Sequence, residues 1–442
     1  MSTEVSTKKR KGIYPGWWMV IAGGIMCFWG YGIHLYSFGN YVKTLIADFG
    51  WTRAQVSLAY SFGRLEGGLE GPFGGMATDK WGPRAVNLTG FILLGIGLCS
   101  MYFVNSLWMF YVVWIIASTG ANLGLGGPLD AALANWFIKR RGFTIAIMRS
   151  VIALSGPIIV PGTMLLLLLF GWRDAFLITG IGTLCIGVPL TWFFIKPRRP
   201  EYYGWLPDGK RIDEEIAADT EATIQAGVEY AAAEEEVEFT VRQALKTRTW
   251  WICVVAMAFR GMVTPALNLH TVPYILDMGI DPMVAAAAMG TMVFMTAPGR
   301  LLFGWLGDRV KKNRIRYLVM LAHSIQALGV FIFTRATSMV GIWVYLVVFG
   351  IGNGASIMIW PPLRGRYWGR KAYSTIQGAM QPFSMIAGVI APVYAGWVYD
   401  TTGSYSSAFN MILVFVIIAV VIMFFATPPK PPKKVSHITD VV

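Results

Sequence analysis

The sequence predicts an all-α membrane protein whose twelve transmembrane helices form two pseudo-symmetric six-helix bundles. Three observations support this prediction. The 442 residues are 55% hydrophobic and only 14% charged, which is too little charge to cover a water-soluble protein of this length. Apolar stretches of about 20 residues, enough to cross a bilayer, occur twelve times. Features of the first half of the chain also recur in the second half.

The predicted spans divide the chain into two bundles and a central loop. We expect the first bundle within residues 1–195, the central loop at 196–247, the second bundle at 248–427 and a cytoplasmic tail at 428–442. The central loop holds twelve of the 24 acidic residues, as suits a solvated connection. The first and seventh spans are long enough to tilt or break. The spans are 16–46, 54–78, 85–105, 108–136, 142–170, 172–195, 248–277, 283–306, 315–336, 339–363, 373–400 and 405–427.

The distribution of Lys and Arg predicts the orientation. Of the 37 basic residues, 29 lie in or directly beside the two tails and the five connections on the same side as the tails. Only Arg53, Arg173 and Arg335 lie in connections on the other side. Because loops rich in Lys and Arg stay in the cytoplasm, we expect a multi-pass protein of the cytoplasmic (inner) membrane with both termini cytoplasmic. The net charge of +13 then indicates contact with the lipid bilayer and not with nucleic acid.

Three pairs of matching features indicate an internal duplication. A Trp-Trp pair opens the first and seventh spans, an Asn lies in a Gly-rich stretch of the fourth and tenth, and a Gly-x-x-x-Asp pattern follows the second and eighth. The pairs are Trp17 with Trp250, Asn122 with Asn353 and Asp79 with Asp308, at offsets of 233, 231 and 229 residues. Nearly equal offsets favour two homologous halves.

The pattern after the second span carries a family resemblance. Residues 75–84 read Gly-x-x-x-Asp-Lys-x-Gly-x-Arg, and residues 304–309 hold a shorter copy. Both resemble the signature motif of the major facilitator superfamily, and the resemblance covers essentially the whole chain. It implies the major facilitator fold and a charge latch that closes the cytoplasmic side. The gating residues it implies are Gly75, Asp79, Arg84, Gly304, Asp308 and Arg309. Without the resemblance, these charges would be simple helix-end charges.

A narrower resemblance is to the monocarboxylate transporters and the bacterial oxalate/formate antiporter. Its motifs include Phe38-Gly39, residues 139–142, Gly171-Trp172-Arg173, His270-x-x-Pro273-Tyr274 and residues 396–409. It implies transport of small organic anions, with Arg300 at the position of the arginine that pairs with the substrate carboxylate. The chain departs from the family at Tyr36, Thr296 and Ser384, which stand where relatives often carry charged residues.

Ionisable residues inside the predicted spans indicate where function lies. A charge at the bilayer centre costs at least about 2.5–3.5 kcal/mol, so it usually faces a cavity or a partner. In the seventh span, Arg260 shares a stripe with Asn268, and Pro265 between them predicts a broken helix, which is typical of binding sites in carriers. The candidate substrate-binding residues are Arg300, Arg260, Arg149, Asn268, His270 and Tyr36. The candidates for proton coupling are Glu66, Glu70, Asp130 and His34.

Structural interpretations of the same residues stay open. Arg64, Glu66 and Glu70 would also suit a salt-bridge network between helices. The fold that the resemblance implies places the span of Arg149 partly at the interface between the bundles. The four cysteines stand alone in apolar stretches, so we interpret them as buried packing residues and not as a disulfide framework or a metal site. The sequence therefore predicts neither a cofactor nor a metal.

Three functions are compatible with these features to different degrees. The favoured one is a secondary active transporter of mono- or dicarboxylates that works by alternating access, as a proton symporter or as an anion exchanger. The second is a carrier of the same fold for a drug or an inorganic anion, with its buried arginines in structural salt bridges. The third, a membrane enzyme or sensor, is disfavoured because the sequence has no Walker, Gly-x-Ser-x-Gly or His-Glu-x-x-His motif.

Overall fold

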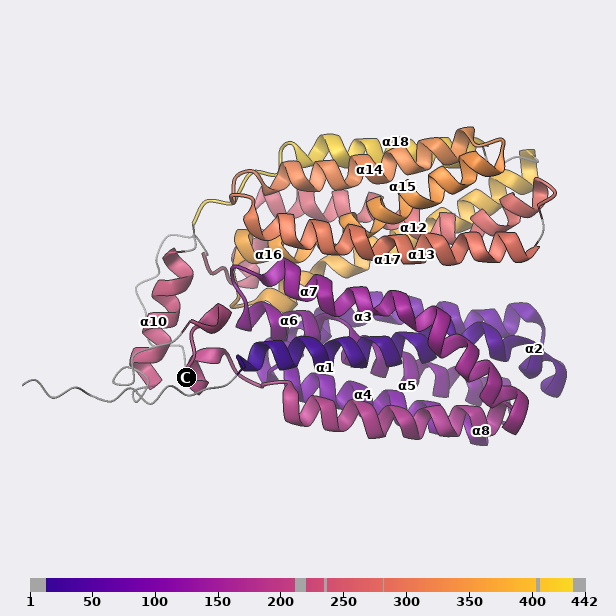
Figure 1. The fold of residues 1–442 in the computed structure, drawn as a ribbon, viewed down its shortest axis with the longest axis horizontal. Coiled ribbons are helices and arrows are strands. Elements are labelled where there is room, and N and C mark those ends of the chain that lie inside the picture. Colours follow the sequence, from indigo (N-terminus) through magenta and orange to yellow (C-terminus); the bar gives the residue numbers. More distant parts are fainter. Residues whose placement is uncertain (1–12, 211–219, 234–236, 281, 403–405, 432–442) are drawn as a thin grey trace, which may run out of the picture.

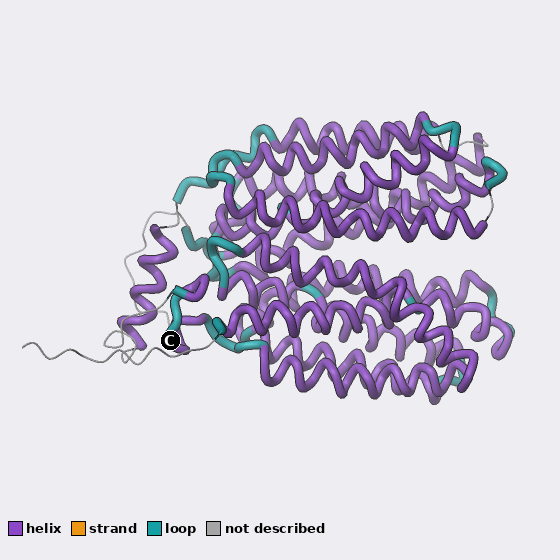
Figure 2. The backbone as a smooth tube through the Cα atoms, viewed as in Figure 1, coloured by secondary structure: helices purple, strands orange, loops and turns teal. Residues whose placement is uncertain are grey.

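The computed structural model describes residues 13–210, 220–233, 237–280, 282–402 and 406–431. Within these ranges every regular element is helical, and loops are short (Figure 2). Figure 1 shows two helical bundles side by side, one formed by α1 to α8 and the other by α12 to α18. The predicted all-α architecture of two bundles is therefore confirmed. Helix α10 lies beyond one end of the bundles, which is called the α10 end below.

The first bundle contains the first six predicted spans. Its elements are α1 (Pro15–Gly30), η1 (Tyr31–Tyr36), α2 (Phe38–Phe49), α3 (Arg53–Trp81), α4 (Pro83–Ser100), η2 (Met101–Phe103), α5 (Leu107–Leu125), α6 (Gly127–Trp136), α7 (Arg141–Ser150), η3 (Val151–Leu154) and α8 (Ser155–Phe194). Helix α8 joins the fifth span to the sixth. The two are separated at Gly171, whose φ of 81° is easily reached only by glycine.

The second bundle contains the last six spans, and short helices lie in the central loop between the bundles. The loop elements are η4 (Pro200–Tyr203), η5 (Pro207–Gly209), α10 (Thr220–Ala233) and α11 (Val241–Leu245). The second bundle consists of α12 (Arg248–Asp277), α13 (Pro282–Arg309), α14 (Ile315–Arg335), α15 (Met339–Met358), α16 (Trp360–Trp368), α17 (Tyr373–Thr402) and α18 (Ser406–Met423).

Nine helices in the described ranges are long and apolar enough to cross a membrane. They cover ten of the twelve predicted spans, because the stretch Arg141–Phe194 holds two. The other two predicted spans correspond to α3 and α13, each of which contains side chains outside the described part of the structure. These are also the helices through which the bundles meet, since α3 packs on α17 and α13 packs on α7.

The first span is one helical stretch with an irregular segment inside it, whereas the seventh is regular throughout. Between α1 and α2 the backbone forms the π-helix η1, a rare conformation that often marks functional sites. In contrast, α12 is one helix of 30 residues that runs through Pro265. The prediction of a broken helix there is wrong, because the neighbouring helices of a membrane bundle can tolerate a proline within a span.

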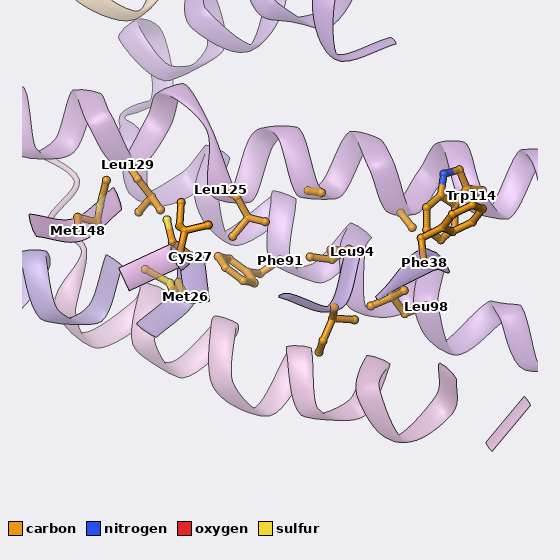
Figure 3. Packing of buried hydrophobic residues seen from close by; sticks show 14 of the residues in the cluster. Met26, Cys27, Phe38, Phe91, Leu94, Leu98, Trp114, Leu125, Leu129 and Met148 are labelled. Atoms are coloured by element: carbon orange, nitrogen blue, oxygen red, sulfur yellow. The ribbon is translucent and has the colours of Figure 1, made fainter. Parts of the chain in front are cut away.

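A hydrophobic core fills the first bundle. Figure 3 shows Met26, Phe91, Leu125 and Met148 converging from α1, α4, α5 and α7. Helices α5 and α7 also carry polar residues that are described below, so this core helps to fix how those residues are oriented.

The cysteines only partly follow the sequence prediction. Cys27 and Cys253 are buried, but Cys99 is half-buried and Cys185 is exposed. The expectation of four buried packing residues is therefore wrong for Cys185. In a membrane protein an apolar side chain can face lipid as comfortably as the protein core.

Candidate functional site

A cavity of about 500 Å³ lies between the two bundles. This size suits a small-molecule ligand. Elements η1, α3 and α5 form one wall, and α12 and α17 form the other. The polar side chains in its lining include those of His34, Glu70, Ser118, Asn122, Arg260, Thr264, Gln377, Gln381 and Ser384. Both halves therefore contribute polar groups to this cavity, which is called the central cavity below.

Arg260 is the arginine that the structure places in this lining. Its Nη1 donates a hydrogen bond of 3.4 Å to Ser356 Oγ, and its buried Nε has no hydrogen-bond partner. Among the described residues, no carboxylate forms an ion pair with it. Arg260 thus presents to the cavity a positive charge that no described carboxylate pairs with directly.

The helix around Arg260 is held by a polar network inside the second bundle. Thr264, one turn later in α12, also lines the cavity and donates a 2.8 Å hydrogen bond to Asn353 Oδ1. The same oxygen accepts a 3.5 Å hydrogen bond from Gln326 Nε2. This network fixes the rotation of α12 and so the direction of Arg260. The side chain of Asn268, a further candidate on this stripe, lies outside the described part of the structure.

Arg300 does not line the cavity but joins the two bundles beside it. From α13, its Nη1 donates a 2.6 Å hydrogen bond to the backbone carbonyl of Arg149 in α7. Its Nε is buried without a partner, and no ion pair with a described carboxylate is present. Electrostatic interactions with Tyr31 and Tyr36 place it near the first span.

The guanidinium group of Arg149 is fully engaged in hydrogen bonds. Its Nε and Nη2 donate to Asp130 Oδ1 over 3.1 and 2.9 Å. Nη1 donates to the Tyr31 hydroxyl and to the Leu125 carbonyl, and Nη2 also donates to the Gly126 carbonyl. All five N–H groups of the guanidinium have acceptors. In this arrangement Arg149 has no donor left for a substrate, and Asp130 is held in an ion pair.

Two of the coupling candidates line the cavity. Glu70 does so from α3, and His34 does so from η1. The His34 ring stacks on Trp114 with centroids 4.7 Å apart, and its Nε2 lies 3.3 Å from Ser118 Oγ. Its buried Nδ1 has no hydrogen-bond partner. The side chains of Glu66 and Arg64 are not among those that the structure describes.

Two further sequence candidates lie away from the cavity lining. The Nε2 of His270 is 3.1 Å from the carbonyl of Pro392, a contact that joins α12 to α17. Tyr36 ends η1 and interacts electrostatically with Arg300. Both side chains therefore take part in contacts between helices in this state.

Asp79 connects the bundles at the α10 end. From the end of α3, its carboxylate accepts hydrogen bonds from the backbone N–H of Ser374 over 3.3 Å and of Thr375 over 2.8 Å, at the start of α17. The hydroxyl of Thr375 donates a further bond of 2.7 Å. Gly75, one turn earlier, lies against the carbonyl of Ser374, where a Cβ would overlap. Glycine and aspartate act together: one permits close approach, and the other caps the facing helix.

Asp308 repeats this arrangement from the other half. From the end of α13, its two carboxylate oxygens accept 2.7 Å hydrogen bonds from the backbone N–H of Gly142 and of Phe143, at the start of α7. Gly304 packs against the carbonyl of Gly142. In both halves the aspartate contacts the second and third residues of the facing helix, so the repeat found in the sequence is also a repeat of contacts.

The basic residues of the two motifs stay within their own bundles. Arg84 Nε donates a 2.6 Å hydrogen bond to the carbonyl of Ile195, and its guanidinium lies over Trp192. The guanidinium of Arg309 lies 3.6 Å from the ring centroid of Trp305. Within the two motifs, the contacts between the bundles thus come from the aspartates and glycines.

A second connection at the α10 end is not predicted by the sequence. Arg370, before α17, donates to Glu201 Oε1 over 3.3 Å and to the carbonyl of Asn135 over 3.1 Å. The side chains of Arg370 and Glu201 are 1% and 4% exposed, so this ion pair between the second bundle and the central loop is buried. No sequence signal distinguishes these two residues from the many other charges in loops.

Comparisons with known proteins agree with this architecture. The family described as Major Facilitator Superfamily matches residues 20–392. Rat (Rattus norvegicus) monocarboxylate transporter 12 is 26% identical over 353 residues, which cover 76% of this chain and 70% of the relative. Bovine (Bos taurus) monocarboxylate transporter 13 is 24% identical over 407 residues, which cover 91% and 87%. The proton:xylose symporter XylE, solved with 6-bromo-6-deoxy-D-glucose, matches with a TM-score of 0.72 over 93% of this chain and 95% of that one. At 12% identity, this last similarity shows the fold alone.

Proposed function

The chain belongs to the major facilitator superfamily, and from this premise we propose that it is a secondary active transporter of small organic anions, mono- or dicarboxylates. It is a transporter of this superfamily, related at about 25% identity to monocarboxylate transporters, and not an enzyme. The proposal concerns what it carries and how.

The observation that carries the proposal is Arg260 in the central cavity. It provides a positive charge that no described carboxylate pairs with directly, in a cavity that both bundles line. A guanidinium stays charged and binds a carboxylate through two parallel hydrogen bonds. Because a buried charge without a partner is costly, an anionic ligand at this position would stabilise the site.

Arg300 would act as a second substrate ligand when the bundles move. In the present state its Nη1 holds the Arg149 carbonyl across the interface. Rocking of one bundle against the other would break that bond and release a second guanidinium next to the cavity. Arg149 would keep its structural pair with Asp130 throughout.

The closed α10 end fits one state of alternating access. Asp79 and Asp308 hold the bundles together at that end. We assign the α10 end to the cytoplasm because Lys and Arg concentrate in its loops. Both termini would then lie on the cytoplasmic side of the inner membrane. Opening at this end and closing at the other would then deliver substrate to the cytoplasm.

Transport of the substrate anion would be coupled to movement of a proton or of a counter-anion. With Asp130 paired to Arg149, the described carboxylate and imidazole groups in the cavity lining are Glu70 and His34. Protonation of Glu70 would balance charge when an anion enters beside Arg260. If neither group carries a proton, exchange of one anion for another provides the same balance.

A second candidate function is a carrier of a drug or an inorganic anion. The Arg149–Asp130 pair matches what that function requires of a structural arginine. Arg260 has no ion pair with a described carboxylate, which a structural arginine would require. The carboxylate proposal is therefore favoured. If Arg300→Lys and Arg260→Lys both left transport and affinity unchanged, this second function would replace the first.

Uptake into reconstituted vesicles tests the proposal. Purified protein is placed in liposomes, and uptake of labelled mono-, di- and aromatic carboxylates is followed with and without an imposed pH gradient. We expect saturable uptake of at least one carboxylate above that of protein-free liposomes. No uptake of any of them under either condition would overturn the proposal.

A further inference from the structure

A second hollow, of about 440 Å³, lies at the α10 end on the seam between the bundles. It is separate from the central cavity and shares none of its lining residues. Its walls come from the start of α1, the segment before α7 together with the start of that helix, and the last turns of α13. We call it the seam crevice.

The seam crevice is rich in positive charge. Lys139 and Arg140 line it from the first bundle, and Arg309 lines it from the second. Arg140 and Arg309 are exposed, and neither forms an ion pair with a carboxylate of the described residues. Since Arg309 lies against the Trp305 ring, its guanidinium is held in one place at the crevice wall.

The one acidic lining residue does not cancel this charge by a direct ion pair. Both oxygens of Asp308 accept backbone N–H groups of α7. The carboxylate is thus directed into the helix start, and the guanidinium groups of Arg140 and Arg309 are left for a different anion. Among the described lining residues, three cations and one carboxylate give a net positive charge.

Aromatic residues form the rest of the wall and place the crevice at the membrane surface. Trp17, Phe143 and Trp305 line it. Trp side chains concentrate at the headgroup level of a bilayer, and helices α1 and α7 start here while α13 ends here. Leu301 and Leu302, one turn earlier on α13, are exposed and continue the helix surface toward the hydrocarbon region. A ligand with a charged head and an apolar tail would match a basic crevice that continues into exposed apolar side chains.

We propose that the seam crevice binds the phosphate headgroup of an anionic phospholipid. Arg140 and Arg309 would contact the phosphate, each from one bundle, while the acyl chains would extend along the exposed leucines of α13. Basic pockets between helices at the cytoplasmic surface commonly bind such headgroups. Because its two arginines belong to different halves, a bound lipid would also stabilise the closed α10 end.

Native mass spectrometry of the full chain in detergent tests this proposal. Phosphatidylglycerol and phosphatidylcholine of the same acyl chains are titrated separately, and inorganic phosphate is titrated as a third arm. Arg140→Gln removes one exposed contact, and Arg140→Gln with Arg309→Gln removes both. Arg242→Gln, an exposed arginine of α11 outside the crevice, is the control with matched charge loss.

We expect phosphatidylglycerol to bind wild type at least about tenfold tighter than phosphatidylcholine. Arg140→Gln should weaken its binding about fivefold and the double variant about 30-fold, since each basic contact near a membrane surface contributes about 1 kcal/mol. The Arg242→Gln variant should bind phosphatidylglycerol as tightly as wild type does. Phosphatidylglycerol should also raise the midpoint of thermal unfolding of wild type and not that of the double variant.

Three outcomes would overturn the proposal. One is equal binding of the two lipids, and another is wild-type binding by the double variant that elutes as a folded monodisperse protein. The third is displacement of the lipid by equimolar inorganic phosphate, which would assign the crevice to a free anion and not to a lipid.

Discussion

Arg149 donates two hydrogen bonds to a single carboxylate oxygen of Asp130, from Nε over 3.1 Å and from Nη2 over 2.9 Å. Both side chains belong to the first bundle, and both are about one-tenth exposed. This pair separates the arginines into two groups. Arg149 is compensated, whereas Arg260 and Arg300 have no described carboxylate partner, and the proposed anion site depends on that difference.

Removing one partner of the Arg149–Asp130 pair should destabilise the protein strongly. Asp130→Ala leaves a buried guanidinium uncompensated, which typically costs about 3–5 kcal/mol. We expect a lower midpoint of thermal unfolding in detergent, and partial recovery in the double variant Asp130→Ala with Arg149→Gln. An unchanged midpoint in Asp130→Ala would contradict the structural role of the pair.

Asp308 and Asp79 should hold the α10 end closed. Asp308→Ala removes two hydrogen bonds to a charged acceptor, each contributing about 1.5–3 kcal/mol. We expect a new population with a longer distance between spin labels at Lys80 and Lys371, which are exposed and lie on different bundles. Asp79→Ala should act in the same direction.

The control for this measurement is Asp174→Ala, which removes a carboxylate at the start of the sixth span, at the opposite end from α10. The distance distribution should then match that of wild type. If both Asp79→Ala and Asp308→Ala also kept the wild-type distribution, the aspartates would be simple helix caps without a role in closure.

The buried Arg370–Glu201 pair should anchor the central loop. Arg370→Gln leaves Glu201 without its cation in a site where the carboxylate is almost fully enclosed. We expect thermolysin to cleave within residues 196–247 at least about tenfold faster than in wild type, because local opening becomes easier. Lys371 is the exposed neighbour of Arg370, and thermolysin should cleave the Lys371→Gln variant at the wild-type rate. Equal rates for all three proteins would show that the pair does not hold the loop.

Much of the fold could be predicted from the sequence, because lipid imposes a simple rule on length and polarity. Twelve apolar spans, an internal repeat and a single long acidic loop follow from counting residues. The two aspartates of the repeated motif are also recognisable from the sequence alone. The π-helix η1 is not, since its insertion depends on packing against α5 and α8 and not on local composition.

The site could be predicted only in part, because a sequence shows which charges are buried but not how each helix is rotated. Arg149 and Arg260 look alike as isolated arginines within apolar spans. One meets Asp130 and three other acceptors, and the other faces the cavity. The partnership of Arg370 with Glu201 joins residues 169 positions apart, and nothing local specifies it.

Glu70 should determine whether transport responds to a proton gradient. It lines the cavity in the bundle opposite Arg260, and as a carboxylate it can take a proton when an anion binds. We expect Glu70→Gln to abolish the stimulation of uptake by an acidic exterior while exchange of preloaded anion continues. His34→Asn should keep the stimulation but bind substrate more weakly, since the His34 ring and Trp114 form part of the cavity wall. Full stimulation in Glu70→Gln would remove Glu70 from the coupling mechanism.

The central claim is that Arg260 binds the carboxylate of the substrate. The most direct test measures the initial rate of uptake of a labelled carboxylate, below saturation, into liposomes that contain equal amounts of wild type, Arg260→Gln, Arg260→Lys or Arg242→Gln. Loss of a charge-assisted pair in a buried site should reduce the rate for Arg260→Gln about 100-fold, whereas Arg260→Lys should retain part of it because the charge remains. Arg242→Gln should transport as wild type does. A wild-type rate and an unchanged KM in Arg260→Gln would contradict the claim.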